Sequence, residues 1–160
     1  MDADAVGSQF IDQLVDEVDG LAALHGLERI KLVGDMYFAG CGLSQPYLDH
    51  VPRSAAFALE ARDAIRELSE GYLIHPEVGA GIDSGPVTVG LSGSSRLVYD
   101  AWGETTTAAH YLARLAKPGE ILISETVKGL LPPDIAVSVR GEQPPVWEIT
   151  GHRVAEDVTL

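Results

Sequence analysis

The organisation of the chain is clearest at Glu28-Arg29-Ile30-Lys31-Leu32-Val33-Gly34-Asp35-Met36-Tyr37. Two runs of β-forming residues, 29–33 and 36–41, flank Gly34-Asp35, and such a pair between two runs indicates a tight hairpin. A carboxylate at a hairpin tip is held rigidly and suits a divalent metal, which needs oxygen ligands. The commoner explanation for this pattern is that Gly34-Asp35 only forms a turn, with Lys31 as a solvated strand residue.

Helices and further strands are expected around this hairpin. The apolar spacing predicts helices over 8–24, with Ser8 as the candidate cap, over 53–70 and over 105–116, with a short helical turn near 125–130. Additional strands are expected over 78–83, 87–91, 97–100, 121–124, 136–139 and 146–149. Because several strands are joined by short turns, in the order helix, hairpin, helix, hairpin, helix, hairpin, we predict an α/β (α+β) fold. Its sheet is expected to be mostly antiparallel, with helices packed on it.

Composition restricts the class of protein. With 160 residues and 46% apolar content, the chain can build one core but not two, and we expect a domain over 1–150 and a C-terminal tail over 151–160. The net charge of −13 repels phosphate backbones, so no nucleic-acid partner is expected. No apolar run is long enough to span a membrane, so no direct membrane contact is expected. The single cysteine, Cys41, suits the cytoplasm, including the cytoplasmic part of a larger, membrane-anchored protein.

Two more segments carry residues suited to chemistry. Residues 81–87 (GIDSGPV) contain glycines that allow a tight turn and close approach of the backbone, although an ordinary hairpin explains them equally well. Residues 99–107 (YDAWGETTT) place polar side chains at a predicted helix start, where free amides can bind phosphate; a capping cluster is the commoner explanation. Within this segment, Asp100 can accept hydrogen bonds from an exocyclic amine, because a carboxylate only accepts.

Taken together and in order, these motifs resemble the class III adenylate and guanylate cyclase catalytic domain. The resemblance runs from about residue 8 to residue 149 and includes Lys117-Pro118-Gly119-Glu120-Ile121 after the third helix. It implies a ferredoxin-like sheet, ATP as the substrate, and two domains that pair head to tail with the active site between them. The partner would be a second cyclase domain, in a homodimer or a heterodimer.

The resemblance also assigns metal and base contacts. In this family two aspartates bind two Mg²⁺ or Mn²⁺ ions, which activate the ribose 3′-hydroxyl and neutralise the departing pyrophosphate. Asp35 matches the second metal aspartate, whereas the motif that carries the first, on an opening strand, has no counterpart in this chain. Lys31 and Asp100 match the pair that recognises adenine, through the ring N1 and the 6-amino group. The resemblance therefore implies an ATP-type site with a weakened metal site.

The catalytic positions of the family differ here. Where the family has a ribose-orienting asparagine and a transition-state arginine, this chain has Thr107 and Tyr111. Thr107 retains a hydroxyl, while Tyr111 carries no charge to meet developing negative charge. Arg114, three residues further along the helix, could partly substitute for the missing arginine. Arg140 on the last hairpin is a second candidate to contact the polyphosphate, although its alignment with the family is loose.

Two functions remain open from the sequence. The first is an adenylate cyclase domain that converts ATP to cAMP and pyrophosphate, impaired in this chain and completed by an upstream strand or by a partner. The second is a degenerate cyclase-homology domain that binds nucleotide and acts as a regulatory dimerisation module. Because the absent opening strand is central in such a sheet, its absence would leave two rows of backbone groups without partners.

Overall fold

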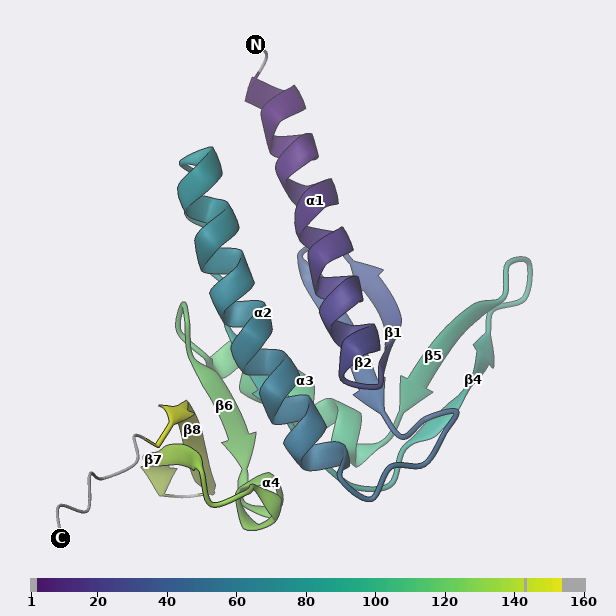
Figure 1. The fold of residues 1–160 in the computed structure, drawn as a ribbon. Helices are drawn as coiled ribbons and strands as arrows, with labels where there is room; N and C mark the ends of the chain where they lie inside the picture. The colour runs from purple at the N-terminus through teal and green to yellow at the C-terminus, as the bar shows by residue number, and fades with distance from the viewer. Residues whose placement is uncertain (1–2, 143, 154–160) are drawn as a thin grey trace, which may run out of the picture.

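Two long helices and three groups of strands make up the fold (Figure 1). The computed structural model describes residues 3–142 and 144–153. The helices are α1 (Ala3–Leu24), α2 (His50–Tyr72), α3 (Glu104–Leu115) and the short α4 (Glu125–Leu130). Helices α1 and α2 lie against each other, and both extend well beyond the strands (Figure 1).

The strands are mostly antiparallel, as predicted, but they form three hydrogen-bonded sheets rather than one. The first pairs β1 (Leu27–Val33) with β2 (Met36–Cys41), and the second pairs β4 (Thr88–Ser92) with β5 (Val98–Trp102). The third has the order β3-β6-β8-β7. Its strands are β3 (Ala80–Ile82), β6 (Ile121–Ser124), β7 (Ile135–Glu142) and β8 (Pro145–His152). The predicted α+β class, with helices packed on strands, is confirmed.

The hairpin at Gly34-Asp35 forms as predicted. Val33 pairs with Met36 across the turn, and Gly34 has a φ of 58°, the positive φ that a tight type II′ hairpin turn needs at its first central residue. A register shift between Arg29 and Lys31 interrupts the ladder. This bulge places both Leu27 and Ile30 in the core, three residues apart, which strict alternation along a strand does not allow.

The hairpin expected around Ser84-Gly85-Pro86 is wrong. Strand β3 pairs in parallel with β6, and β4 pairs with β5 instead. Packing explains the difference, because a Cβ on Gly81 would lie 2.3 Å from Ala113 N and 2.4 Å from Ala109 O. The glycine in this motif therefore lets β3 lie directly against the backbone of α3, a use of glycine that the local sequence did not distinguish from a turn.

The main core lies between α2, α4 and the four-stranded sheet. Its most deeply buried side chains include Ile121, Ile123, Val127 and Ile149. A second, smaller cluster joins β1, β2 and β5 through Ile30, Phe38 and Ala101. The smaller cluster matters for function because the residues beside its members, Lys31 and Asp100, are candidate site residues.

The ends of the chain differ from the sequence-based boundaries. Helix α1 begins at Ala3 rather than at Ser8, so Ser8 lies inside the helix and does not cap it. At the other end β8 runs to His152, which takes the first two residues of the predicted tail into the sheet; residues 154–160 of that tail lie outside the described residues. Within 3–142 and 144–153, no helix is both long and apolar enough to cross a membrane.

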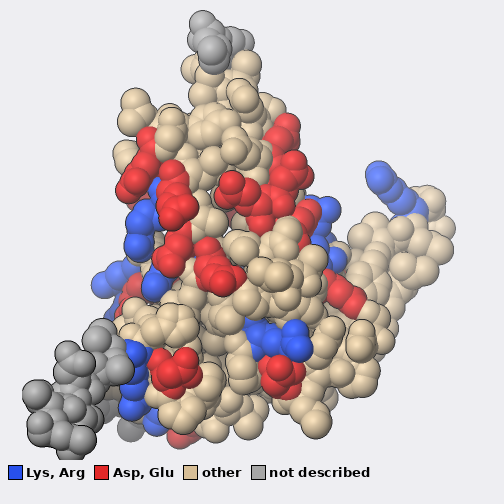
Figure 2. Space-filling view, in the orientation of Figure 1, with Lys and Arg blue, Asp and Glu red and all other residues tan. Residues whose placement is uncertain are grey.

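Acidic side chains gather over the two long helices. Figure 2 shows Asp and Glu residues spread over α1 and α2, with fewer Lys and Arg between them. This surface carries much of the net charge of −13, and it repels polyanions.

Candidate nucleotide-binding site

Lys31 and Asp100 lie in contact although 69 positions separate them in the sequence. The Lys31 Nζ lies 3.1 Å from Asp100 Oδ1 and donates to Oδ2 at 3.2 Å. About a quarter of the Lys31 side chain and a fifth of the Asp100 side chain remain exposed, at 26% and 19%. The pair is therefore partly desolvated and still partly accessible to a ligand.

The carboxylate of Asp100 is held in its ionised form. The backbone N–H of Ala101 donates to Oδ1 at 2.8 Å, and this bond, followed by the contact with Lys31, lowers the pKa of Asp100 against the opposing effect of burial. An ionised carboxylate offers about four acceptor positions. The N–H of Ala101 and the Nζ of Lys31 each donate one hydrogen bond to it, which leaves about two acceptor positions for a ligand.

The predicted metal ligand, Asp35, is exposed at the tip of the β1–β2 hairpin. Among the residues that the structure describes, no three His, Cys, Asp or Glu side chains are grouped to bind a metal ion. Mg²⁺ can be held by one or two carboxylates together with substrate phosphates. Asp35 fits the role of one such ligand, and the donor set present here does not fit a complete two-metal site.

The start of α3 presents backbone and hydroxyl groups beside Asp100. Gly103 precedes the helix with a φ of 128°, and its carbonyl accepts hydrogen bonds from Thr106 Oγ1 at 2.9 Å and Thr107 Oγ1 at 3.1 Å. A threonine hydroxyl has one proton to donate. Thr107 therefore directs its proton to the protein backbone, and it can offer a ribose hydroxyl only an acceptor in this conformation.

An open pocket of about 640 Å³ lies along the same face of α3, lined by Gly103, Glu104, Thr107, Ala108 and Tyr111. Both positions that differ from the family pattern, Thr107 and Tyr111, thus border one cavity. Tyr111 is exposed and lies in the middle of the helix. Arg114 is also exposed, but it is not among the residues that line this pocket.

Arg140 is engaged elsewhere. Its Nε donates to Glu120 Oε2 at 2.7 Å and its Nη2 to Glu120 Oε1 at 3.2 Å, a two-point ion pair. This pair holds the pKa of Glu120 at about 2, and the backbone N–H of Lys117 contributes. Because its charge is already paired, Arg140 is not free to bind a polyphosphate without breaking this contact.

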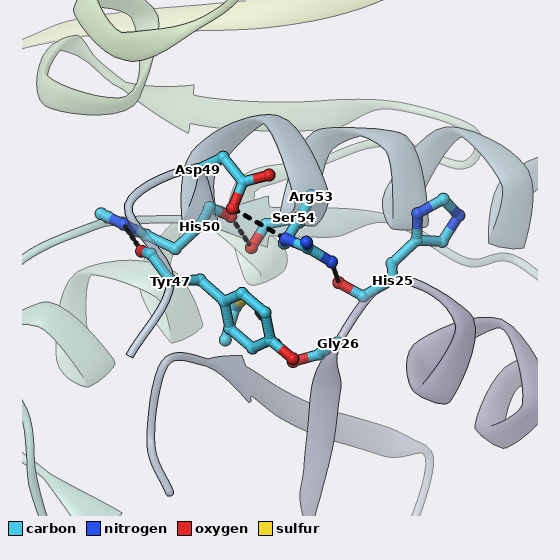
Figure 3. Close-up of polar contacts among 8 residues, drawn as sticks. His25, Gly26, Tyr47, Asp49, His50, Arg53 and Ser54 are labelled. Atoms are coloured by element: carbon cyan, nitrogen blue, oxygen red, sulfur yellow. Dashed lines mark hydrogen bonds and ion pairs between the residues drawn. The ribbon is translucent and has the colours of Figure 1, made fainter. Parts of the chain in front are cut away.

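Sequence reasoning missed Arg53, which anchors the loop before α2 (Figure 3). Its guanidinium lies 4.2 Å from the centre of the Tyr47 ring, and it donates to Asp49 Oδ1 at 2.8 Å and to the carbonyl of His25 at 3.2 Å. His50, at the start of α2, makes a 2.7 Å hydrogen bond between its Nε2 and Ser84 Oγ. Through Tyr47, whose carbonyl lies 3.1 Å from His50 Nδ1, these contacts join the residue after α1, the loop and the 84–86 turn.

The 84–86 turn also contacts the start of α3. Thr105 Oγ1 donates to the carbonyl of Pro86 at 2.9 Å, and a Cβ on Gly85 would lie 2.6 Å from the same hydroxyl. The contacts of Arg53 and His50 therefore support the helix start that borders the pocket. The sequence held only a weak signal for them, because Arg53 was simply the predicted first residue of a helix.

A comparison with known protein families matches residues 5–152 to the adenylate and guanylate cyclase catalytic domain. The chain belongs to this family. The adenylate cyclase of Mycobacterium tuberculosis H37Rv is 31% identical over 156 residues, which covers 93% of this chain and 35% of that protein. A germination-specific adenylate cyclase of Dictyostelium discoideum is 32% identical over 138 residues, 82% of this chain and 16% of that protein. The chain thus spans about a third or less of these relatives.

Solved structures share the fold of this cyclase domain. The catalytic core of a rhodopsin-guanylyl cyclase with converted specificity, in complex with ATPαS, superposes with a TM-score of 0.84 at 22% identity; the match covers 95% of this chain and 86% of that one. The adenylyl cyclase CyaB from P. aeruginosa gives a TM-score of 0.79 at 20% identity, over 96% and 86% of the two chains. The architecture found here is therefore that of nucleotide cyclase catalytic domains.

Proposed function

We propose that this cyclase domain recognises ATP and takes part in its conversion to cAMP and pyrophosphate. The observation that carries the proposal is the Lys31–Asp100 contact, which joins one donor and one acceptor at a partly exposed edge. Adenine presents an acceptor at N1 and a donor at its 6-amino group, whereas guanine presents the reverse. A site whose polar groups are left unpaired by the wrong base discriminates strongly.

Nucleotide binding at this site would involve Asp35 as one ligand of a Mg²⁺ or Mn²⁺ ion. The family is generally dependent on a divalent metal, which supplies neutralisation of the phosphate charge when bound. We propose that the chain contributes one carboxylate to it, and that the backbone amides at the start of α3, after Gly103, favour phosphate as helix starts generally do. We infer that a second carboxylate comes from other sequence or from a partner.

The catalytic step is proposed to be weak in this chain. Thr107 directs its proton to Gly103, and Tyr111 offers no positive charge for the pyrophosphate. These two positions favour the alternative role, a nucleotide-binding regulatory domain, when the chain acts alone. With a complete partner the same nucleotide site would serve catalysis.

We also propose that the partner is another cyclase domain, as a homodimer or heterodimer. The β4–β5 hairpin projects away from the helices (Figure 1). It exposes large apolar side chains at Val89, Leu91, Leu97, Val98 and Trp102. A concentration of exposed apolar residues on one element is typical of an interaction surface.

We propose the cytoplasm as the location of the domain. A single cysteine, Cys41, and the proposed use of ATP are both consistent with that compartment.

Two measurements test the proposal: the formation of cAMP from ATP with Mn²⁺, and the binding of ATP and GTP by calorimetry. We expect ATP to bind, to bind more tightly than GTP, and to turn over slowly in the isolated chain and faster when an active cyclase domain is added. ATP binding without turnover in either mixture would leave the regulatory function in place of the enzymatic one. If ATP does not bind more tightly than GTP, the proposal is wrong.

A further inference from the structure

The 84–86 turn connects the start of α2 with the start of α3. At one end of the turn, Ser84 Oγ lies 2.7 Å from His50 Nε2, and His50 is the first residue of α2. At the other end, the carbonyl of Pro86 accepts a hydrogen bond from Thr105 Oγ1 at 2.9 Å. Two side-chain hydrogen bonds therefore join the turn to both helices.

The start of α3 packs closely on this turn. The residue before the helix is Gly103, which has no side chain to cap the helix as Ser, Thr, Asp or Asn would. A Cβ on Gly103 would lie 3.6 Å from the carbonyl oxygen of Pro86, and a Cβ on Gly85 would lie 2.6 Å from Thr105 Oγ1. Because Gly103 and Glu104 also border the open pocket, the position of the turn sets the position of that border.

The contacts of His50 determine which of its nitrogens carries the proton. Nδ1 lies 3.1 Å from the carbonyl of Tyr47, and a carbonyl oxygen only accepts, so Nδ1 is the donor. A neutral imidazole with its proton on Nδ1 has an acceptor at Nε2, and the hydroxyl of Ser84 donates to it. The imidazole therefore fixes the first residue of the turn relative to the loop before α2.

We propose that His50 is a positioning residue for the nucleotide: through the 84–86 turn it holds the start of α3 in the position that accepts the phosphates of a nucleoside triphosphate. The inference rests on the proposed function, since it concerns the same nucleotide site. The base is assigned to Lys31 and Asp100, whereas the turn contacts the start of α3. Displacing that helix start should therefore weaken the binding of ATP and of GTP by the same factor and leave their ratio unchanged.

Calorimetry of ATP and GTP binding to the whole chain, with Mn²⁺, tests the proposal. His50→Asn, which is too short to reach Ser84, and Ser84→Ala should each lower both affinities about fivefold, the value of one neutral hydrogen bond. The two changes together should cost no more than either alone, because they remove the same contact. His50→Gln, whose amide oxygen can accept from Ser84, should restore binding. Ser54→Ala is the matched control, because its hydroxyl donates to the carbonyl of His50 at 2.8 Å on the side of α2.

Thr105 tests the other end of the turn. Thr105→Val keeps the shape of the side chain and removes the donor to the carbonyl of Pro86. We expect the same fivefold loss for both nucleotides. Thr105→Ser retains the hydroxyl and should bind like the unmodified chain. Equal losses in the valine and the serine variants would show that the hydrogen bond to Pro86 does not position the helix start.

NMR of the chain without nucleotide separates this inference from the proposed function. At about pH 8, at which imidazoles are generally neutral, His50 should carry its proton on Nδ1. The amide signals of Gly103 and Thr105 should shift in Ser84→Ala and stay unchanged in Ser54→Ala. If these signals behave as expected but no nucleotide binds, the proposed function is wrong and the nucleotide role of His50 falls with it, while the coupling of turn and helix stands. A proton on Nε2, additive losses in the double variant or an altered ratio of ATP to GTP affinity would overturn the inference.

Discussion

Lys31 on β1 and Asp100 on β5 form an ion pair whose shortest N–O distance is 3.1 Å. The bulge between Arg29 and Lys31 places Lys31 opposite Phe38, and Asp100 lies opposite Gly90 on the neighbouring hairpin. The β1–β2 hairpin thus contributes a hydrogen-bond donor and the β4–β5 hairpin an acceptor to the same candidate site. The base preference of the domain should depend on this pair.

The combined change Lys31→Glu with Asp100→Cys should move the preference from ATP toward GTP, because it removes the donor for N1 and the acceptor for the 6-amino group. We expect the ratio of ATP to GTP affinity to fall by about 10- to 100-fold, the range for hydrogen bonds to charged groups. Calorimetry with both nucleotides measures it. Arg29→Glu, a charge reversal on the same strand outside the pair, is the control and should leave the ratio unchanged. An unaltered ratio in the double variant would refute the adenine assignment.

Asp35→Ala should weaken ATP binding only when metal is present. The side chain is exposed at a hairpin tip, so its loss should not disturb the fold. With Mn²⁺ we expect affinity to fall by about tenfold, the scale of one charged contact. With a chelator in the buffer the variant and the unmodified chain should bind alike. Equal loss under both conditions would mean that Asp35 contacts something other than a metal.

Much of the fold was predictable from local pattern, and the errors have identifiable causes. The Gly34-Asp35 hairpin and the cores of α1, α2 and α3 follow from turn chemistry and apolar spacing. The glycines at 81 and 85 misled the interpretation, because close packing against α3 and a hairpin turn demand the same residue type. Ser8 misled the interpretation as well, because the sequence alone does not distinguish a serine that caps a helix from a serine inside one.

The site was predictable only in part. The roles proposed for Lys31, Asp35 and Asp100 rest on family resemblance, since no local rule connects residues 69 positions apart. The orientation of the Thr107 hydroxyl and the pairing of Arg140 with Glu120 depend on neighbours that only the folded chain supplies.

Restoring the family residues at α3 should raise activity. Thr107→Asn with Tyr111→Arg places an amide and a charged fork along the pocket that these positions border. Cyclase activity with Mn²⁺ and an active partner domain should rise about 100-fold, the lower range for one transition-state donor. Tyr111→Phe removes only a hydroxyl and should have no effect. A double variant that binds ATP but gains no activity would show that these positions are not catalytic.

Gly81→Ala should destabilise the domain, because the new Cβ would lie 2.3 Å from Ala113 N. Backbone cannot move aside as a flexible side chain can, so we expect a loss of about 2–3 kcal/mol in the free energy of unfolding. Urea denaturation measures it. The matched control is Gly20→Ala in α1, where nothing lies within 4 Å of the added Cβ; it should stabilise the helix by about 0.5–1 kcal/mol. Equal effects from both would refute the packing role of Gly81.

The Glu120–Arg140 pair should make stability depend on pH in the acid range. The pKa of Glu120 lies at about 2 in the folded chain, lowered mainly by Arg140 from the ordinary 4.5. A lowered carboxyl pKa adds stability above the unfolded value, and this contribution disappears as the pH falls from 4.5 toward 2. Arg140→Gln should therefore lower the Tm by a few degrees at neutral pH, with the difference shrinking in acid. Arg66→Gln, which alters a 4.0 Å surface pair, is the control and should show no such pH trend. A constant Tm difference for Arg140→Gln across the acid range would contradict the assignment.

Glu148 acts in the opposite direction, because burial and the neighbouring Glu120 raise its pKa. Glu148→Gln should therefore raise the Tm at neutral pH.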